Sequence, residues 1–162
     1  MNESIDILAT TNPAYCSLVL RAFAKSYIEA AESEPEYPLA FFALPTILSS
    51  TISRTFQGTN SKTGLLSWIN KNPEVRIELP AVVKRSVPIV RSALVFGLQT
   101  KVFELSSAGT IRLIADRFPK EPKDPSNIAS TCRHFSLAKS LGTWCGKIHS
   151  TSTVFIAIGI TP

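Results

Sequence analysis

The sequence predicts a mainly α-helical domain with one small β-hairpin. Apolar side chains recur at helical spacing over most of residues 12–100, the pattern changes to alternation within residues 101–114, and helical spacing returns after residue 126. At 162 residues the chain has the length of one ordinary domain and can bury a hydrophobic core. We therefore expect a single domain over residues 1–162, in which a helical body precedes the hairpin and a last helix follows it.

The first helix is expected to begin at Asn12-Pro13 and to end near Glu34-Pro35. An asparagine side chain accepts a hydrogen bond from the free amides of a first turn, and proline fits the first helical position. Apolar side chains then recur every four residues, at Tyr15, Val19, Phe23 and Tyr27. This stripe predicts one buried helical face.

The segment from Tyr37 to Leu44 is apolar all round, which predicts a helix at the centre of the fold. Pro45 interrupts the segment, because its ring removes an amide donor and clashes with the preceding turn. We expect either a kink at Pro45 or two abutting helices that end before Gly58.

Two further helices are expected before residue 100. A short helix over Thr63–Ile69 is closed by residues 70–73, which include a proline. A long helix over Pro80–Gln99 follows, with a break at Pro88. The apolar positions of the long helix are Val83, Val87, Val90, Leu94 and Leu98.

The hairpin is expected over about residues 101–114. Residues 101–105 and 110–114 alternate polar and apolar side chains around Ser106-Ser107-Ala108-Gly109, which is typical of two strands and a turn. A helix followed by a twisted hairpin is the arrangement of winged-helix proteins, so we expect a winged-helix-related helical domain. Three prolines and charges of both signs predict an exposed connector at about residues 117–125.

The C-terminal helix and tail occupy residues 126–162. The helix is expected to begin near Asp124 or Ser126 and to stop at Gly146. Its predicted buried positions are Ile128, Cys132, Phe135, Ala138, Leu141 and Cys145. In the tail, Val154–Ile158 is too short for periodicity to decide between a strand and a short buried helix.

The composition suggests a partner. Hydrophobic residues make up 44% of the chain and charged residues 18%, which favours an apolar surface patch for a protein partner or a second copy. Residues 1–36 carry six acidic side chains against two basic ones, so the rest of the chain supplies the net charge of +5. A basic body can meet phosphate or an acidic partner. No secretory signal or bilayer-spanning stretch is evident and the three cysteines are an odd count, so we expect a cytoplasmic protein with no membrane contact.

No motif predicts catalysis. Lys62-Thr63-Gly64 lacks the upstream glycines of a nucleotide-binding loop, and the serine-lysine motif of acyl-serine hydrolases is missing. The residue types of a zinc site occur at Cys132, His134, Cys145 and His149. Cys132 and His134 are two residues apart on a predicted helix and therefore point to separate faces. We favour buried thiols over a metal site and expect neither an enzyme nor a cofactor.

Two groups of side chains are candidates for partner contact. Phe56, Leu65 and Trp68 offer large apolar surfaces suited to a protein partner, while a place in the core is the alternative that we favour slightly for Trp68. Basic side chains of the long helix and the hairpin region suit phosphate or an acidic partner, and we favour protein docking over DNA. These candidates are Lys84, Arg85, Arg91, Lys101, Arg112 and Arg117.

A series of short motifs in the chain is typical of a known family. In chain order they include Asn12-Pro13-x-Tyr15, Leu44-Pro45, Thr63-Gly64-Leu65-Leu66-x-Trp68, Asn72-Pro73-Glu74-x-Arg76, Ala93-Leu94-x-Phe96-Gly97 and Leu141-Gly142-x-Trp144. In this order they resemble the middle component of bacterial three-component ABC ATPase systems, and the similarity covers most of the chain.

The resemblance implies a small, non-catalytic subunit. Its expected partners are an ABC ATPase of the SMC-like (chromosome-maintenance) or repair type and a third component, in systems that act against phages or other mobile DNA. It supplies no catalytic residues. We therefore expect an accessory subunit that bridges the other two components or couples the state of the ATPase to an effector, with DNA contact within the complex left open. The alternatives are a winged-helix DNA-binding regulator and, third, an enzyme that uses the Cys/His cluster.

Overall fold

The computed structural model describes residues 11–114 and 129–161, without the side chains of residues 129–132. The described residues form seven helices and one two-stranded antiparallel sheet, which confirms the predicted fold class. The elements are α2 (Pro13–Ala31), α3 (Leu39–Leu48), α4 (Ser50–Arg54), α5 (Leu65–Lys71), α6 (Glu74–Gln99), β1 (Phe103–Leu105), β2 (Ile111–Leu113), α7 (Ala129–Ile148) and α8 (Thr151–Ala157). The predicted connector at residues 117–125 and the positions of Arg117 and Ile128 lie outside the described residues.

Helix α2 begins as the sequence predicts. The Asn12 Oδ1 atom accepts a hydrogen bond from the Ala14 amide at 2.9 Å, and Pro13 occupies the first turn. The helix ends at Glu32, whose left-handed backbone conformation lets its amide donate to the Ile28 carbonyl. The predicted stripe is buried at Val19, Phe23 and Tyr27.

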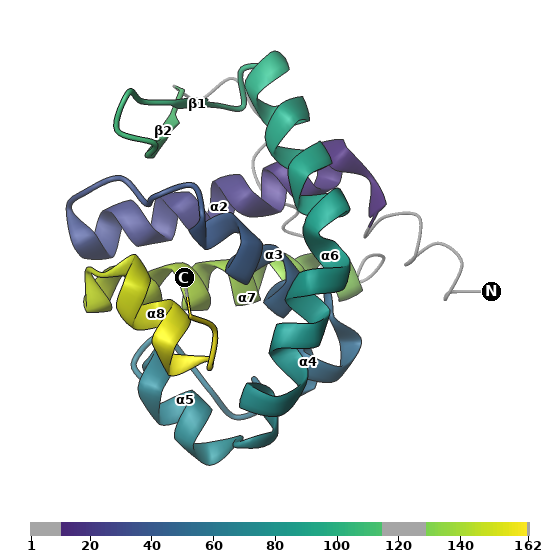
Figure 1. The fold of residues 1–162 in the computed structure, drawn as a ribbon, viewed down its shortest axis with the longest axis vertical. Helices are drawn as coiled ribbons and strands as arrows, with labels where there is room; N and C mark the ends of the chain where they lie inside the picture. Colours follow the sequence, from purple (N-terminus) through teal and green to yellow (C-terminus); the bar gives the residue numbers. More distant parts are fainter. Residues whose placement is uncertain (1–10, 115–128, 162) are drawn as a thin grey trace.

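Helices α2 and α7 lie side by side and form the centre of the fold (Figure 1). Two glycines of α7, four residues apart and therefore on one face, allow the close approach. A Cβ atom on Gly142 would lie 2.3 Å from the Phe23 carbonyl oxygen, and one on Gly146 would lie 2.7 Å from the Tyr27 carbonyl oxygen. The prediction that Gly146 stops the helix is wrong, because this glycine serves packing and α7 continues to Ile148.

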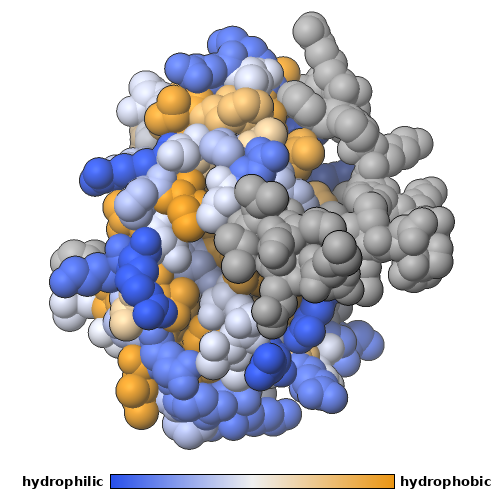
Figure 2. Space-filling view, turned by 90° about the vertical axis from the view of Figure 1, so that its right-hand side faces the viewer, coloured by the Kyte–Doolittle hydropathy of each residue, from blue (hydrophilic) through white to orange (hydrophobic). Residues whose placement is uncertain are grey.

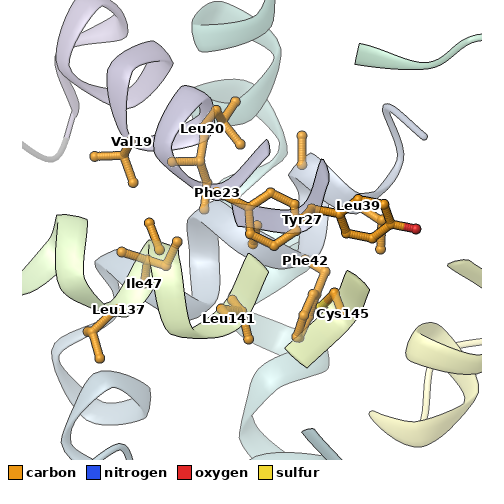
Figure 3. Close-up of a cluster of buried hydrophobic side chains, with 14 of the residues drawn as sticks. Val19, Leu20, Phe23, Tyr27, Leu39, Phe42, Ile47, Leu137, Leu141 and Cys145 are labelled. Carbon is orange, nitrogen blue, oxygen red and sulfur yellow. The ribbon is translucent and has the colours of Figure 1, made fainter. Parts of the chain in front are cut away.

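Helix α3 completes the central core. Figure 3 shows apolar side chains of α2, α3 and α7 that converge on one another. The labelled members are Val19, Leu20, Phe23, Tyr27, Leu39, Phe42, Ile47, Leu137, Leu141 and Cys145. Helix α3 runs through Pro45 and ends at Leu48, and Ser49 then caps α4 with its hydroxyl. The predicted pair of abutting helices is present, with the break at Ser49 rather than at Pro45.

Helix α6 crosses the α2–α7 pair steeply along one side of the molecule (Figure 1). It contacts α2 and α3 with one face, where Leu79, Val90 and Ala93 are fully buried. The helix is continuous through Pro80 and Pro88, so the predicted break at Pro88 is wrong. Pro88 lies on the exposed side, where water can satisfy the carbonyl that a proline leaves without its helical partner.

The hairpin is folded against the body. Strands β1 and β2 pair in the register Phe103 with Leu113 and Leu105 with Ile111. Backbone hydrogen bonds then join the hairpin to the segment after α2, from the Ile111 amide to Pro35 and from the Tyr37 amide to Gly109. The winged-helix relationship stays a prediction, since the fold class alone does not test it.

The tail forms a helix rather than a strand. In α8, Val154 and Phe155 are buried, and the Arg76 Nε of α6 donates a hydrogen bond to the Ala157 carbonyl at 3.0 Å. This contact joins the end of the chain to the start of α6. Within the described residues, no helix combines the length and the apolar character that crossing a membrane requires.

Candidate functional site

The structure divides the predicted basic contacts into two groups. Lys84, Arg85 and Arg91 are exposed on α6 and form no ion pair with any described residue. Lys101 and Arg112 are also exposed, but each pairs with a carboxylate, at 3.5 Å to Glu104 and at 2.9 Å to Glu34 respectively. The first group is therefore the one whose charge is left for another molecule.

Arg112 belongs to a small network that fixes the hairpin. Its Nε donates to the Glu34 Oε1 atom, and the Thr110 hydroxyl donates to the other oxygen of the same carboxylate. Hydrogen bonds from Thr110 and then from Arg112 lower the pKa of Glu34 below its ordinary value. The Arg112 side chain thus has a structural partner, and its role in contacting phosphate or an acidic protein stays an untested prediction.

The solvent side of α6 carries a surface that we call the α6 outer face. Its members follow one another at steps of four and three residues, which places them on one side of a helix. They are Ile77, Ala81, Lys84, Pro88, Arg91 and Val95, and all are exposed. The acidic residues of α6 are confined to its first two turns, at Glu74 and Glu78. The rest of the face is therefore apolar and basic.

The apolar members of this face are unusually exposed. Ile77 is 79% exposed and Val95 is 52% exposed, although both are large aliphatic residues. Figure 2 shows the side of the molecule at right angles to Figure 1, where hydrophobic and hydrophilic side chains alternate in small patches. A mixed apolar and basic surface of this kind is typical of protein interfaces more than of phosphate-binding surfaces.

Phe56, Leu65 and Trp68, the predicted apolar anchors, lie in the core. Trp68 is fully buried, Leu65 is 2% exposed and Phe56 is 5% exposed. Phe56 stacks on Trp144 with ring centroids 5.3 Å apart and an interplanar angle of 3°, and Trp68 packs on both rings. The core alternative that the sequence left open for Trp68 is thus the arrangement observed. Direct partner contact by these three residues stays untested.

Two hydrogen bonds hold the indole rings in this cluster. The Trp68 Nε1 donates to the Thr55 hydroxyl at 2.9 Å, and the Trp144 Nε1 donates to the Asn60 carbonyl at 3.0 Å. Both acceptors lie in the segment between α4 and α5. The cluster therefore anchors this segment to α5 and α7, and Leu66, 50% exposed, is the large apolar side chain that α5 leaves on the surface.

The described members of the Cys/His cluster do not support the zinc alternative. Cys145 is fully buried, His149 is exposed beyond the end of α7, and the His134 Nδ1 forms a hydrogen bond with the Tyr15 hydroxyl at 2.7 Å. Burial raises the pKa of the Cys16 thiol to about 11 and also raises the pKa of Cys145. Among the described residues no three metal-ligating side chains are grouped, while the side chain of Cys132 lies outside them.

Two surface hollows escaped the sequence analysis. One, of about 330 Å³, lies between α3, α4 and α6 and includes Arg85. The other, of about 440 Å³, is lined by Arg54 and Arg133 among others, and Arg133 donates to the Ser53 carbonyl at 2.9 Å. Both form where segments far apart in the sequence meet, so no local pattern signals them.

Comparisons with known proteins bear on what these surfaces are for. No curated protein and no solved structure matches the chain. A family model described as ABC-three component (ABC-3C) system Middle Component 3 matches residues 4–162, nearly the whole sequence. The chain therefore belongs to this family of middle components of ABC-three component systems.

Proposed function

We propose that the chain is a non-catalytic bridging subunit that joins an ABC ATPase to the third component of its system. The observation that carries the proposal is the α6 outer face, in a chain that belongs to a family of middle components. This face holds exposed aliphatic side chains beside cations that have no partner within the described residues. Such a surface gains most from an acidic protein that also covers apolar area.

The proposal includes the kind of system. The ATPase partner is of the SMC-like or repair type, and the assembly acts against phages or other mobile DNA. These two points come from the resemblance of the motif order to this family, so they need tests of their own. Co-purification identifies the ATPase, and phage challenge of cells that carry or lack the gene tests the defence role.

Charge argues against a second copy as the occupant of the α6 outer face. A symmetric dimer on this face would bring Lys84 and Arg91 near their own counterparts, and like charges at an interface oppose association. An acidic partner meets no such opposition. A homodimer through another surface stays an open prediction.

The first test is a pull-down of the tagged chain expressed with its genomic neighbours, at low and moderate salt and with nuclease present. We expect an ABC ATPase to co-purify under all conditions. The double variant Lys84→Glu/Arg91→Glu should weaken its capture at least about tenfold, which corresponds to about 1.4 kcal/mol. The matched control is Lys62→Glu/Lys71→Glu, which makes the same charge change at exposed positions before and within α5 and should leave capture unchanged.

The second candidate function is a DNA-binding regulator, which Lys84, Arg85 and Arg91 favour, since they form no ion pair with any described residue. These cations would then contact phosphates, and binding would fall steeply with salt. Recovery of nucleic acid alone, removed by nuclease and by moderate salt, would replace the bridging proposal with this one. The exposed Ile77 and Val95 on the same helix are the reason that we rank it second.

A further inference from the structure

The hollow between α3, α4 and α6 differs from the α6 outer face, because buried apolar side chains contribute to its lining together with polar ones. Leu44 and Val90 are fully buried at its base, and the partly exposed Leu48, Val82 and Ile89 also line it. Its volume of about 330 Å³ lies at the small end of the range for ligand-binding pockets, which starts at roughly 300 Å³. We call it the α3–α6 groove.

The local sequence explains why the groove is open. Helix α3 ends at Leu48, and the extended backbone of Ser49 turns the chain into α4 instead of continuing along α6. On the α6 side, Ser86 lies one turn from both Val82 and Val90. Because its side chain is small, Ser86 leaves space between two valines that a larger residue would fill.

The polar side of the groove has one charge. Arg85 is the one charged residue among those that line it, and its guanidinium forms no hydrogen bond or ion pair with a described residue. Hydroxyl groups lie around it, including Ser86 and Ser49. The Ser49 oxygen accepts the Ile52 amide, which leaves the hydroxyl proton available for an acceptor. The mouth of the groove therefore offers the donors of one guanidinium and of neighbouring hydroxyl groups to a negatively charged or carbonyl oxygen, and no negative charge opposes it among the lining residues.

We propose that the α3–α6 groove binds a short acidic segment of a partner protein, which inserts an apolar side chain between Val82 and Ile89 and places a carboxylate on Arg85. This inference rests on the proposed bridging function and names where one of the other components attaches. The planar guanidinium of arginine matches a carboxylate with two parallel hydrogen bonds, whereas lysine offers only a point charge. The apolar lining makes nucleic acid a poor occupant, since a phosphate backbone has no side chain to bury there.

Two matched pairs of variants test the groove within the co-purified complex. Ser86→Leu fills it, and Ser136→Leu makes the same change at an exposed position of α7. Arg85→Lys keeps the charge but loses the two-pronged hydrogen bond, and Arg54→Lys makes the same change at an exposed position of α4. We expect Ser86→Leu and Arg85→Lys each to weaken capture at least about tenfold, and both controls to stay within about twofold of the parent chain. Thermal unfolding of each variant establishes that it is folded.

Overlapping synthetic peptides that span the captured component then identify the segment. The peptide that binds is expected to contain an Asp or Glu next to an aliphatic or aromatic residue. Replacing that acid with its amide should weaken binding of the peptide by about the same factor as Arg85→Lys weakens capture. If the parent chain captures no component, both the bridging function and this inference fail. If the component is captured and the Ser86→Leu and Arg85→Lys variants bind it as the parent does, the groove assignment fails while the bridging function stands. Binding of every acidic peptide regardless of its apolar residue also overturns the assignment.

Discussion

Helices α2, α7 and α6 have similar apolar character, but the fold treats their surfaces differently. It buries the contact between α2 and α7 and leaves the α6 outer face exposed. Against α2, α7 presents Gly142 and Gly146, so that the two backbones approach to distances at which no Cβ atom would fit. On α6, by contrast, Ile77 and Val95 are exposed to solvent on the same face as cations that have no ion pair within the part of the chain that the structure describes. The first surface is closed by the fold, and the second is left open.

The difference shows which part of the sequence serves folding and which part is available for binding. A helix face that packs against glycine leaves no room for another molecule, and its side chains stabilise the chain by being buried. The α6 outer face contributes little to folding, because its side chains contact little else. Substitutions at the closed surfaces should therefore change the stability of the chain. Substitutions at the open surface should change partner binding.

The largest expected effect is at the aromatic cluster that joins α5 to α7. Trp68→Ala removes a fully buried indole that packs on Phe56 and Trp144, and truncation of buried aromatic residues costs about 3–5 kcal/mol. The free energy of unfolding in urea measures the loss. Leu66→Ala, at the half-exposed neighbouring position, is the control and should change it by less than about 1 kcal/mol. Equal effects at the two positions would mean that Trp68 is not part of the core.

The α2–α7 contact should be the next most sensitive. Gly142→Ala places a methyl group against the Phe23 carbonyl and should destabilise the chain by about 1–3 kcal/mol, even though alanine favours a helix. Ser136→Ala, at an exposed position of the same helix, should be neutral or slightly stabilising. Thermal unfolding distinguishes them. A Gly142→Ala protein as stable as the parent would show that α7 can move away from α2 without loss.

A smaller effect is expected at a single hydrogen bond of the cluster. Thr55→Val keeps the shape of the side chain but removes the acceptor for the Trp68 indole N–H, 2.9 Å away. The net contribution of a typical hydrogen bond is about 0.5–1.5 kcal/mol, and Thr55 is partly exposed, so the loss should be of this size. Thr55→Ser retains the hydroxyl, and with it both this hydrogen bond and the one that the hydroxyl donates to the Ile52 carbonyl at 2.6 Å, so the difference between the two variants measures the two hydrogen bonds together. If both variants lose the same stability, the methyl group rather than the hydroxyl matters.

Much of the fold could be predicted because its signals are local. The cap at Asn12, the stripe along α2 and the alternation around Gly109 each depend on neighbours within a few residues. The predictions fail where the surroundings of a residue in the folded chain override its local preference. Gly146 continues α7 because α2 lies against it, and Pro88 stays within α6 because its side of the helix faces solvent.

The candidate site was predictable only in part. Charge can be counted along a sequence, so Lys84, Arg85 and Arg91 can be named as candidate contacts from the sequence alone. Ion pairs cannot be read from a sequence in this way, since Arg112 and its partner Glu34 are 78 residues apart and meet only through the hairpin. The α3–α6 groove was missed for the same reason, because its two sides come from separate helices and Ser86 has no distinctive pattern of its own.

The smallest effect contrasts Arg112, which pairs with Glu34, with Arg91, which forms no ion pair with a described residue. Since hydrogen bonds from Thr110 and Arg112 hold the pKa of Glu34 below its ordinary value, the stabilisation is fully present above the pKa of glutamate in the unfolded chain. It is lost as the pH falls through the lower pKa of the folded protein. Glu34→Gln should therefore reduce the free energy of unfolding at neutral pH, by at most about 1 kcal/mol for so exposed a pair, and should match the parent in acid. Arg91→Ala should match the parent under both conditions. Urea unfolding at neutral pH and at a pH well below the pKa of glutamate measures both variants. A loss in Glu34→Gln that persists in acid would show that the charge of Glu34 is not what fixes the hairpin.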